Sequence, residues 1–107
     1  MKTVLTNAFS LNMLVQDKAL VSVEQLSLEE AKTVLETNGF ISAVGHQDTA
    51  TILSNLLGLS VSVNRVNVVL DSDTTLIVAQ YRGPRLPEGA AELPEGARIE
   101  FYRVRLV

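Results

Sequence analysis

The stretch from Leu76 to Ala79 restricts the possible folds more than any other part of this sequence. All of its residues are apolar, so an extended chain would carry hydrophobic side chains on both of its alternating faces. A strand with one face in water alternates between apolar and polar residues, whereas a strand buried on both faces does not. The sequence therefore predicts that a strand from Thr74 to Arg82 lies inside a sheet that is covered on both sides.

Helix signals earlier in the chain indicate that the fold mixes helices with strands. Ser27 and Glu30 have the spacing of a capping box. A helix should follow over residues 28–37 and stop at the Asn-Gly pair directly after it. A second helix should open within Gly45–Thr49, where acids and hydroxyls suit a helix start, and should end at Gly58.

Further strands are predicted around these helices, over residues 2–5, 20–26, 60–70 and 98–106. In the third of these strands the apolar residues change from odd to even positions at Asn64-Arg65. A β-bulge explains such a change, and a twist or an irregular edge is the alternative. The turn Asp71–Asp73 would join this strand to the central one as a hairpin. We therefore expect one small α/β domain over residues 1–107, with a mixed sheet of about five strands and two main helices.

Composition limits the chemistry that this domain can perform. The 107 residues have a formal net charge of -3 and include no Cys and one His. The lack of Cys excludes disulfides, thiolate nucleophiles and Cys-ligated metal sites, and one His excludes a multi-His centre within one chain. A negative net charge argues against a protein that coats long nucleic acid by charge alone. We expect no metal, no other cofactor and no long nucleic acid partner.

Nothing in the sequence indicates a membrane protein. The first residues, Met1–Phe9, contain a single Lys and no long apolar stretch, unlike a signal peptide. No later segment approaches the roughly 20 apolar residues that a membrane span needs. We expect a cytoplasmic protein without a membrane partner.

His46 is the only histidine, and it stands directly before the predicted second helix. The N-terminus of a helix attracts phosphate, because unpaired N–H groups and the helix dipole both favour an anion there. An imidazole at this place would meet an anionic ligand and could exchange a proton with it near neutral pH. The alternative is that His46 is an ordinary polar residue at the surface.

Other candidate residues suit an anionic or nucleotide ligand. Every arginine lies after residue 60, and Arg65 at the predicted bulge would suit a phosphate. Arg85 and Glu88 share a proline-stiffened loop, where they could hold an anion and orient an acid or base, or could simply form a solvated turn. Gln80 interrupts an apolar strand and needs partners from a ligand or a loop. Neutral side chains that suit bases, riboses and phosphates, or else local turns, are Asn7, Ser10 and Asn12.

Four parts of the sequence, taken in order, point to a known family. They are Leu5–Leu14, Val44–Thr49, Val63–Val66, and Val78–Gln80 followed by Arg85–Gly89. The combination of Asn-Ala-Phe-Ser-x-Asn-Met with Gly-His-x-x-Thr is fairly specific, although each motif alone is weak. Together these parts, which span nearly the whole chain, resemble the viral anti-CRISPR ring nucleases and the related type III CRISPR ring nucleases.

Members of that family cleave cyclic tetra-adenylate, the second messenger that activates type III CRISPR defence, as homodimers and without metal. The resemblance implies the same activity and partners here, in the cytoplasm of the host cell if the source is a virus. The product would be linear di-adenylate with a 2′,3′-cyclic phosphate, formed by attack of the ribose 2′-hydroxyl. The resemblance implies that His46 protonates the departing 5′-oxygen and that Glu88 assists. The ligand-binding residues that it implies are Asn7, Ser10, Asn12, Arg65, Gln80 and Arg85.

Three alternatives stay open at this point. The loop that precedes Arg85 looks one residue longer than in those relatives, so Arg82 is the alternative phosphate contact. The chain could also bind cyclic oligoadenylate without cutting it, or it could be a viral regulatory or interaction protein.

Overall fold

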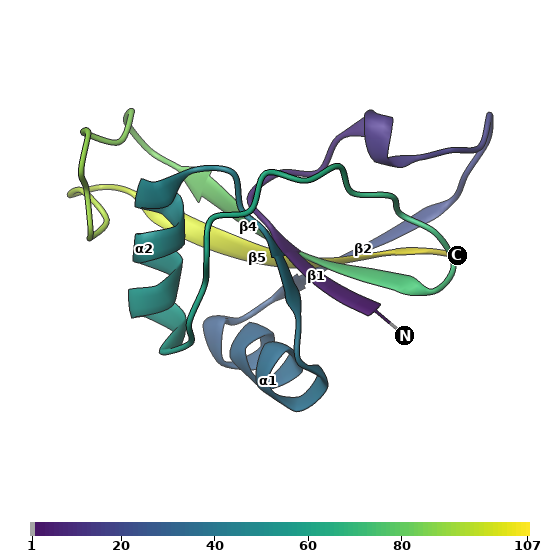
Figure 1. Ribbon diagram of the computed structural model, residues 1–107, viewed down its shortest axis with the longest axis horizontal. Helices are drawn as coiled ribbons and strands as arrows, with labels where there is room; N and C mark the ends of the chain where they lie inside the picture. Colours follow the sequence, from purple (N-terminus) through teal and green to yellow (C-terminus); the bar gives the residue numbers. More distant parts are fainter. Residues whose placement is uncertain (1) are drawn as a thin grey trace.

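A five-stranded mixed sheet forms the centre of the computed structural model, which describes residues 2–107 (Figure 1). The strand order across the sheet is β2-β5-β4-β1-β3. The parallel pairs are β1 with β3 and with β4, and the antiparallel pairs are β5 with β4 and with β2. These elements confirm the predicted α/β class, with five strands and two main helices. Their bounds are β1 Lys2–Thr6, β2 Val21–Leu26, α1 Leu28–Asn38, β3 Ile41–Ala43, α2 Gln47–Leu57, β4 Thr74–Arg82 and β5 Arg98–Leu106, with a short 3-10 helix over Leu11–Met13.

The strand β4 lies at the middle of the sheet, as its apolar run predicted. Residues 74–79 are all buried, and both edges of β4 are paired, one with β1 and the other with β5. Successive side chains of a strand point to opposite faces, so Ile77 and Ala79 face one layer while Leu76 and Val78 face the other. The expectation of a strand covered on both sides is confirmed.

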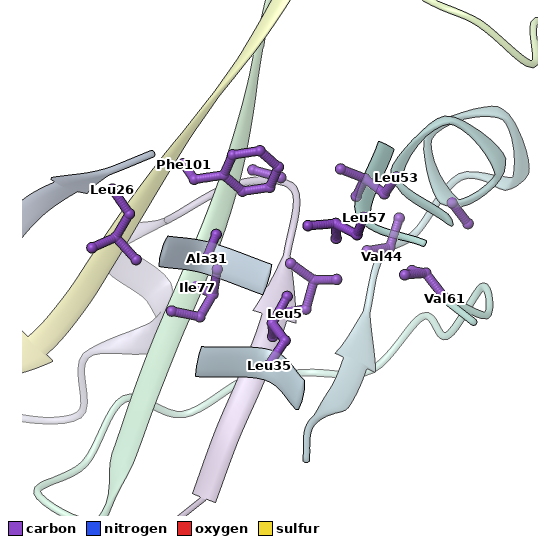
Figure 2. Packing of buried hydrophobic residues seen from close by; sticks show 12 residues of the cluster. Leu5, Leu26, Ala31, Leu35, Val44, Leu53, Leu57, Val61, Ile77 and Phe101 are labelled. Carbon is purple, nitrogen blue, oxygen red and sulfur yellow. The ribbon is translucent and has the colours of Figure 1, made fainter. Parts of the chain in front are cut away.

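Both helices cover the same face of the sheet. Ala31 and Leu35 of α1, with Leu53 and Leu57 of α2, belong to one buried cluster with Ile77. Figure 2 shows these helix side chains directed toward the sheet. Burying one leucine side chain completely stabilises the fold by about 2 kcal/mol, so this layer is a main source of stability.

Irregular segments, rather than helices, cover the opposite face. In the segment over residues 7–20, which contains the 3-10 helix, the half-buried Phe9 and Met13 pack against a second buried cluster. The later part of the segment over residues 58–73 adds Leu70, whose backbone N–H donates to the carbonyl of Met13 at 2.8 Å, whereas Val61 of its first part packs in the helix-side cluster. The two segments therefore support each other above the sheet, which gives β4 its second cover without a third helix.

Local signals place both helix starts and the second helix end as predicted. Ser27 and Glu30 make both hydrogen bonds of the capping box before α1. His46 is the N-cap residue of α2, and Gly58 ends that helix in the left-handed conformation, which glycine adopts without steric cost.

The predicted strand over residues 60–70, its bulge and its hairpin with β4 are wrong. This segment is not a strand, and its single ladder contact is an isolated parallel bridge between Val63 and Val44. A hairpin was impossible because β1 and β5 already occupy both edges of β4. At the parity change, Asn64 contacts the β3 region instead of forming a bulge: its side chain donates to the Ser42 carbonyl at 2.7 Å, and its backbone N–H donates to the Val44 carbonyl at 2.8 Å.

The fifth strand is the short β3, which no local sequence pattern indicates. It joins β1 at the edge of the sheet, and the segment after Ser60 runs beside it. Among residues 2–107, none of the helices has the length and apolar character needed to cross a membrane.

Candidate functional site

Predicted site residues from distant parts of the sequence lie at one end of the sheet, because the three neighbouring strands that lead to them are parallel. In the order β4-β1-β3, Thr6 pairs with Val78 on one side and with Ala43 on the other. Asn7 follows the end of β1, His46 follows the end of β3, and β4 ends close by at Arg82. In open α/β sheets, ligands bind at the carboxyl ends of parallel strands. The fold therefore brings segments that are far apart in sequence to one end of the sheet.

A hollow of about 840 Å³ lies at this end, between α2 and the loop that joins β4 to β5. His46, at the N-terminal end of α2, lines it from one side, and Arg85 and Glu88 line it from the loop. Figure 1 shows this loop in yellow-green beside α2. The side chains of these three residues make no hydrogen bond or ion pair within the part of the chain that the structure describes. They are therefore available to a ligand.

The β4–β5 loop is held against α2 by two hydrogen bonds. The backbone N–H of Gly89 donates to Oδ2 of Asp48 at 3.1 Å, and Nδ2 of Asn55 donates to the carbonyl of Ala91 at 2.9 Å. Gly89 has a φ of 78°, a conformation that favours glycine. These contacts hold the side of the hollow that carries Arg85 and Glu88.

A second hollow, of about 550 Å³, shares His46 with the first. Asn7 and Arg65 line it, together with Gly45. Nε of Arg65 donates to the carbonyl of Gly45 at 2.8 Å, so the guanidinium is fixed beside the start of α2. The N–H groups of the first turn of α2 lack a side-chain cap from His46, which leaves them open to an anion.

Three of the predicted binding residues line neither hollow: Ser10, Asn12 and Gln80. Oγ of Ser10 accepts from the backbone N–H of Asn12 at 3.2 Å, which is the local turn hydrogen bond that is the alternative to ligand binding for this residue. Gln80 shares the face of Leu76 and Val78, and its amide donates to the carbonyl of Tyr81 at 3.2 Å. These three residues lie beyond the two hollows and do not complete them.

Arg82, the alternative to Arg85, has a protein partner. Its Nε donates to Glu100 on β5, and Arg98 and the Tyr102 hydroxyl contact the same carboxylate. The hydrogen bond from Arg82 holds the pKa of the Glu100 carboxyl below its usual range, and the pKa of Arg82 is raised in return. Arg82 is therefore engaged within the sheet, whereas Arg85 lines the hollow.

Several residues that line the site have no role assigned to them by the sequence. Asp48 and Thr49 read as ordinary helix-start residues, although both line the first hollow. Tyr81 lines it too, and its hydroxyl donates to the Pro84 carbonyl. Asn67 lines the second hollow from the segment that was predicted to be a strand. A correct assignment of that segment as irregular would have been needed to find it.

Comparison with known proteins gives the chain a family. The model of the STIV B116-like family matches residues 3–102. The chain belongs to this family. B116 of Sulfolobus turreted icosahedral virus has the same fold, with a TM-score of 0.83 and 30% identity over 98% of this chain and 99% of that one.

Two viral relatives are also similar in sequence to this STIV B116-like chain. Uncharacterized protein ORF117 of Acidianus two-tailed virus is 36% identical over 98 residues, or 85% of this chain and 82% of that protein. Uncharacterized protein 26 of Sulfolobus islandicus filamentous virus (isolate Iceland/Hveragerdi) is 39% identical over 70 residues. That match spans 65% of this chain and 58% of that relative's length.

The arrangement can bind an anion and move a proton. Arg65 and Arg85 carry positive charge into the two hollows, and the start of α2 adds unpaired N–H groups. The imidazole of His46 and the carboxylate of Glu88 face one space, as an acid and base pair would. Among residues 2–107, no three His, Asp or Glu side chains are close enough together to hold a metal ion.

Proposed function

We propose that this STIV B116-like protein is a metal-independent ring nuclease that cleaves cyclic tetra-adenylate to linear di-adenylate with a 2′,3′-cyclic phosphate. The observation that carries the proposal is the shared hollow of His46, Arg85 and Glu88. It supports the proposal because it joins a proton donor, a phosphate-binding cation and a carboxylate from two segments that the sequence resemblance named separately.

The chemistry needs few protein groups, because the substrate brings its own nucleophile. The 2′-oxygen of a ribose attacks the neighbouring phosphorus, the bond from phosphorus to the 5′-oxygen breaks, and a 2′,3′-cyclic phosphate forms. His46 gives its proton to the departing 5′-oxygen, and Glu88 assists by taking the proton of the 2′-hydroxyl. Arg85 and the start of α2 stabilise the charge that builds on the phosphate oxygens.

The second hollow extends the binding surface for a ring of four nucleotides. Arg65 and Asn7 bind a further phosphate or ribose there, next to His46. Ser10, Asn12 and Gln80 contact parts of the ring that extend beyond the two hollows. The net charge of -3 is compatible with such a ligand, since a few local arginines suffice for a compact anion.

The relatives support a role in infection. The relatives described above are proteins of viruses. A virus that removes the second messenger of type III CRISPR defence evades that defence, so we propose this role for the chain in the cytoplasm of its host.

The test is a cleavage assay with purified protein, EDTA and rings of different sizes. We expect conversion of cyclic tetra-adenylate to linear di-adenylate, with a loss of about a hundredfold or more in His46→Ala, since general acid catalysis contributes about 10²–10⁴-fold. Ring binding by His46→Ala, measured by calorimetry, should persist because the arginines remain. Binding without any product in the wild type would instead make the protein a sponge for the ring, and absence of binding would favour an interaction protein.

A further inference from the structure

The carboxylate of Asp48 occupies an unexpected place for a site that binds an anion. Asp48 is the second residue of α2 and lines the same hollow as His46, Arg85 and Glu88. A negative charge beside a phosphate weakens phosphate binding by repulsion. An acid in the first turn of a helix complements the helix dipole, and Asp48 also makes a contact outside its helix: its Oδ2 accepts the backbone N–H of Gly89 at 3.1 Å.

A second contact of the same kind lies further along the helix. Asn55 follows Asp48 by seven residues, about two turns, so both side chains lie on one face of α2. Asn55 donates to the carbonyl of Ala91, two residues after Gly89. One helix face thus holds both an N–H and a carbonyl of the same irregular loop.

The other hydrogen bonds of this loop near the hollow do not tie it to α2: the Tyr81 hydroxyl donates to the Pro84 carbonyl, and the Ala90 N–H donates to the Pro87 carbonyl. Residues 83–97 form no helix or strand, and Arg85 and Glu88 are exposed. The contacts of Asp48 and Asn55 hold Gly89 and Ala91, directly after Glu88, and so link the position of Glu88 to α2, the helix that has His46 as its N-cap. A displacement of about 1 Å between reacting groups can lower a rate about a hundredfold.

We propose that Asp48 is a positioning residue, which holds Glu88 and Arg85 opposite His46 through its bond to Gly89, with Asn55 as the second anchor. The proposal rests on the proposed function for its effect on catalysis. The effect on the loop itself is independent of any substrate.

Substitutions at Asp48 separate this role from helix stabilisation. Asp48→Ala removes both the charge and the acceptor, whereas Asp48→Asn removes the charge and keeps an acceptor oxygen. If Asp48 only complements the helix dipole, both variants should show the same loss, because both remove the charge. If Asp48 holds the loop, that contact should be lost in Asp48→Ala and largely kept in Asp48→Asn. The ring should also bind Asp48→Asn at least as tightly as the wild type, because the repulsion between the carboxylate and the phosphate is gone.

The first measurement is the rate at which trypsin cuts after Arg85, followed by mass spectrometry without ligand. We expect Asp48→Ala and Asn55→Ala to be cut several-fold faster than the wild type, and Asp48→Asn to match it. Thr51→Ala is the control, since Thr51 lies on the same helix and bonds only within it. Circular dichroism shows whether each variant is folded. If Asp48→Ala is unfolded, Asn55→Ala tests the same loop.

The second measurement is turnover of cyclic tetra-adenylate at saturating ring. We expect kcat to fall about tenfold or more in Asp48→Ala, with kcat close to the wild-type value in Asp48→Asn. Equal loss in both Asp48 variants, or wild-type proteolysis in Asp48→Ala, would overturn the proposal. If the wild type does not cleave the ring, the proposed function fails while the proteolysis still decides whether Asp48 holds the loop.

Discussion

Two arginines that are close in sequence have different tasks in this molecule. Arg82 points along the sheet to Glu100, whose carboxylate also receives Arg98 and Tyr102. Arg85, three residues later, lines the hollow beside His46 and has no acidic partner within residues 2–107. An arginine that already serves a carboxylate has fewer donors left for a phosphate. The partners of the two side chains therefore favour Arg85 as the phosphate contact.

Binding of the ring to arginine variants tests this assignment. In a His46→Ala background, which prevents cleavage, we expect Arg85→Ala to weaken binding about tenfold or more, because charge-assisted hydrogen bonds to phosphate are lost. Arg82→Ala should change the dissociation constant by less than about threefold, since that side chain is engaged elsewhere. Calorimetry with cyclic tetra-adenylate gives both values. A larger loss in Arg82→Ala would reverse the assignment and would show that the pair with Glu100 opens for the ligand.

At the level of elements, the start of α1 depends on one reciprocal pair of hydrogen bonds. The Ser27 side chain accepts from the Glu30 N–H, and the Glu30 carboxylate accepts from the Ser27 N–H at 2.8 Å. The backbone N–H of Ser27 is the main cause that holds the pKa of the Glu30 carboxyl below its ordinary value. Because the folded-state pKa is the lower one, this contact stabilises the fold above the unfolded pKa and is lost as the pH falls through the folded pKa.

Chemical denaturation of Ser27→Ala tests the capping box. We expect the free energy of unfolding at neutral pH to fall by about 1 kcal/mol, the usual cost of losing an N-cap side chain. The pKa of the Glu30 carboxyl, followed by NMR, should be higher in Ser27→Ala than in the wild type, because the hydrogen bond from the Ser27 side chain is lost while the one from its backbone N–H remains. Ser72→Ala, at an exposed turn, is the matched control. Unchanged stability and an unchanged titration in Ser27→Ala would contradict the role of this box.

The contrast between α1 and β3 shows which elements can be read from the sequence. The signals of α1 lie within a few residues of each other, so Ser27 and Glu30 suffice to predict its start. β3 has only three residues, and its pairing with β1 depends on contacts distant in sequence. The valines after Ser60 have the composition of a strand, but both edges of β4 are already taken. Local propensity shows that a segment is suited to be a strand, whereas the competition for free strand edges decides whether it becomes one.

The same distinction applies to the candidate site. The place of His46 before α2 follows from local helix signals and was predicted. The contact of Asp48 with Gly89 joins residues 41 positions apart, and no local pattern indicates it. Residue types therefore suggest the chemistry of the site, whereas the position of the loop cannot be predicted without the fold.

At the scale of the whole molecule, one chain offers an incomplete surface for the proposed ring ligand. The hollows contain one imidazole and two arginines, Arg65 and Arg85, whereas the ring has four phosphates. A two-fold dimer would double these groups and match the symmetry of the ligand. We therefore propose that the protein acts as a homodimer, with two copies of His46 that each cleave one phosphodiester bond.

Mixed dimers provide the test of this arrangement. Light scattering should give twice the 11.6 kDa mass of one chain for the wild type. Dimers that pair a wild-type chain with a His46→Ala chain, purified through two different tags, contain a single proton donor. Such a dimer should open the ring once and accumulate linear tetra-adenylate, because the second cut requires the ligand to turn or rebind, whereas the wild-type dimer should release di-adenylate without that delay. A monomeric protein, or mixed dimers that form di-adenylate as directly as the wild type, would show that each chain completes both cuts alone.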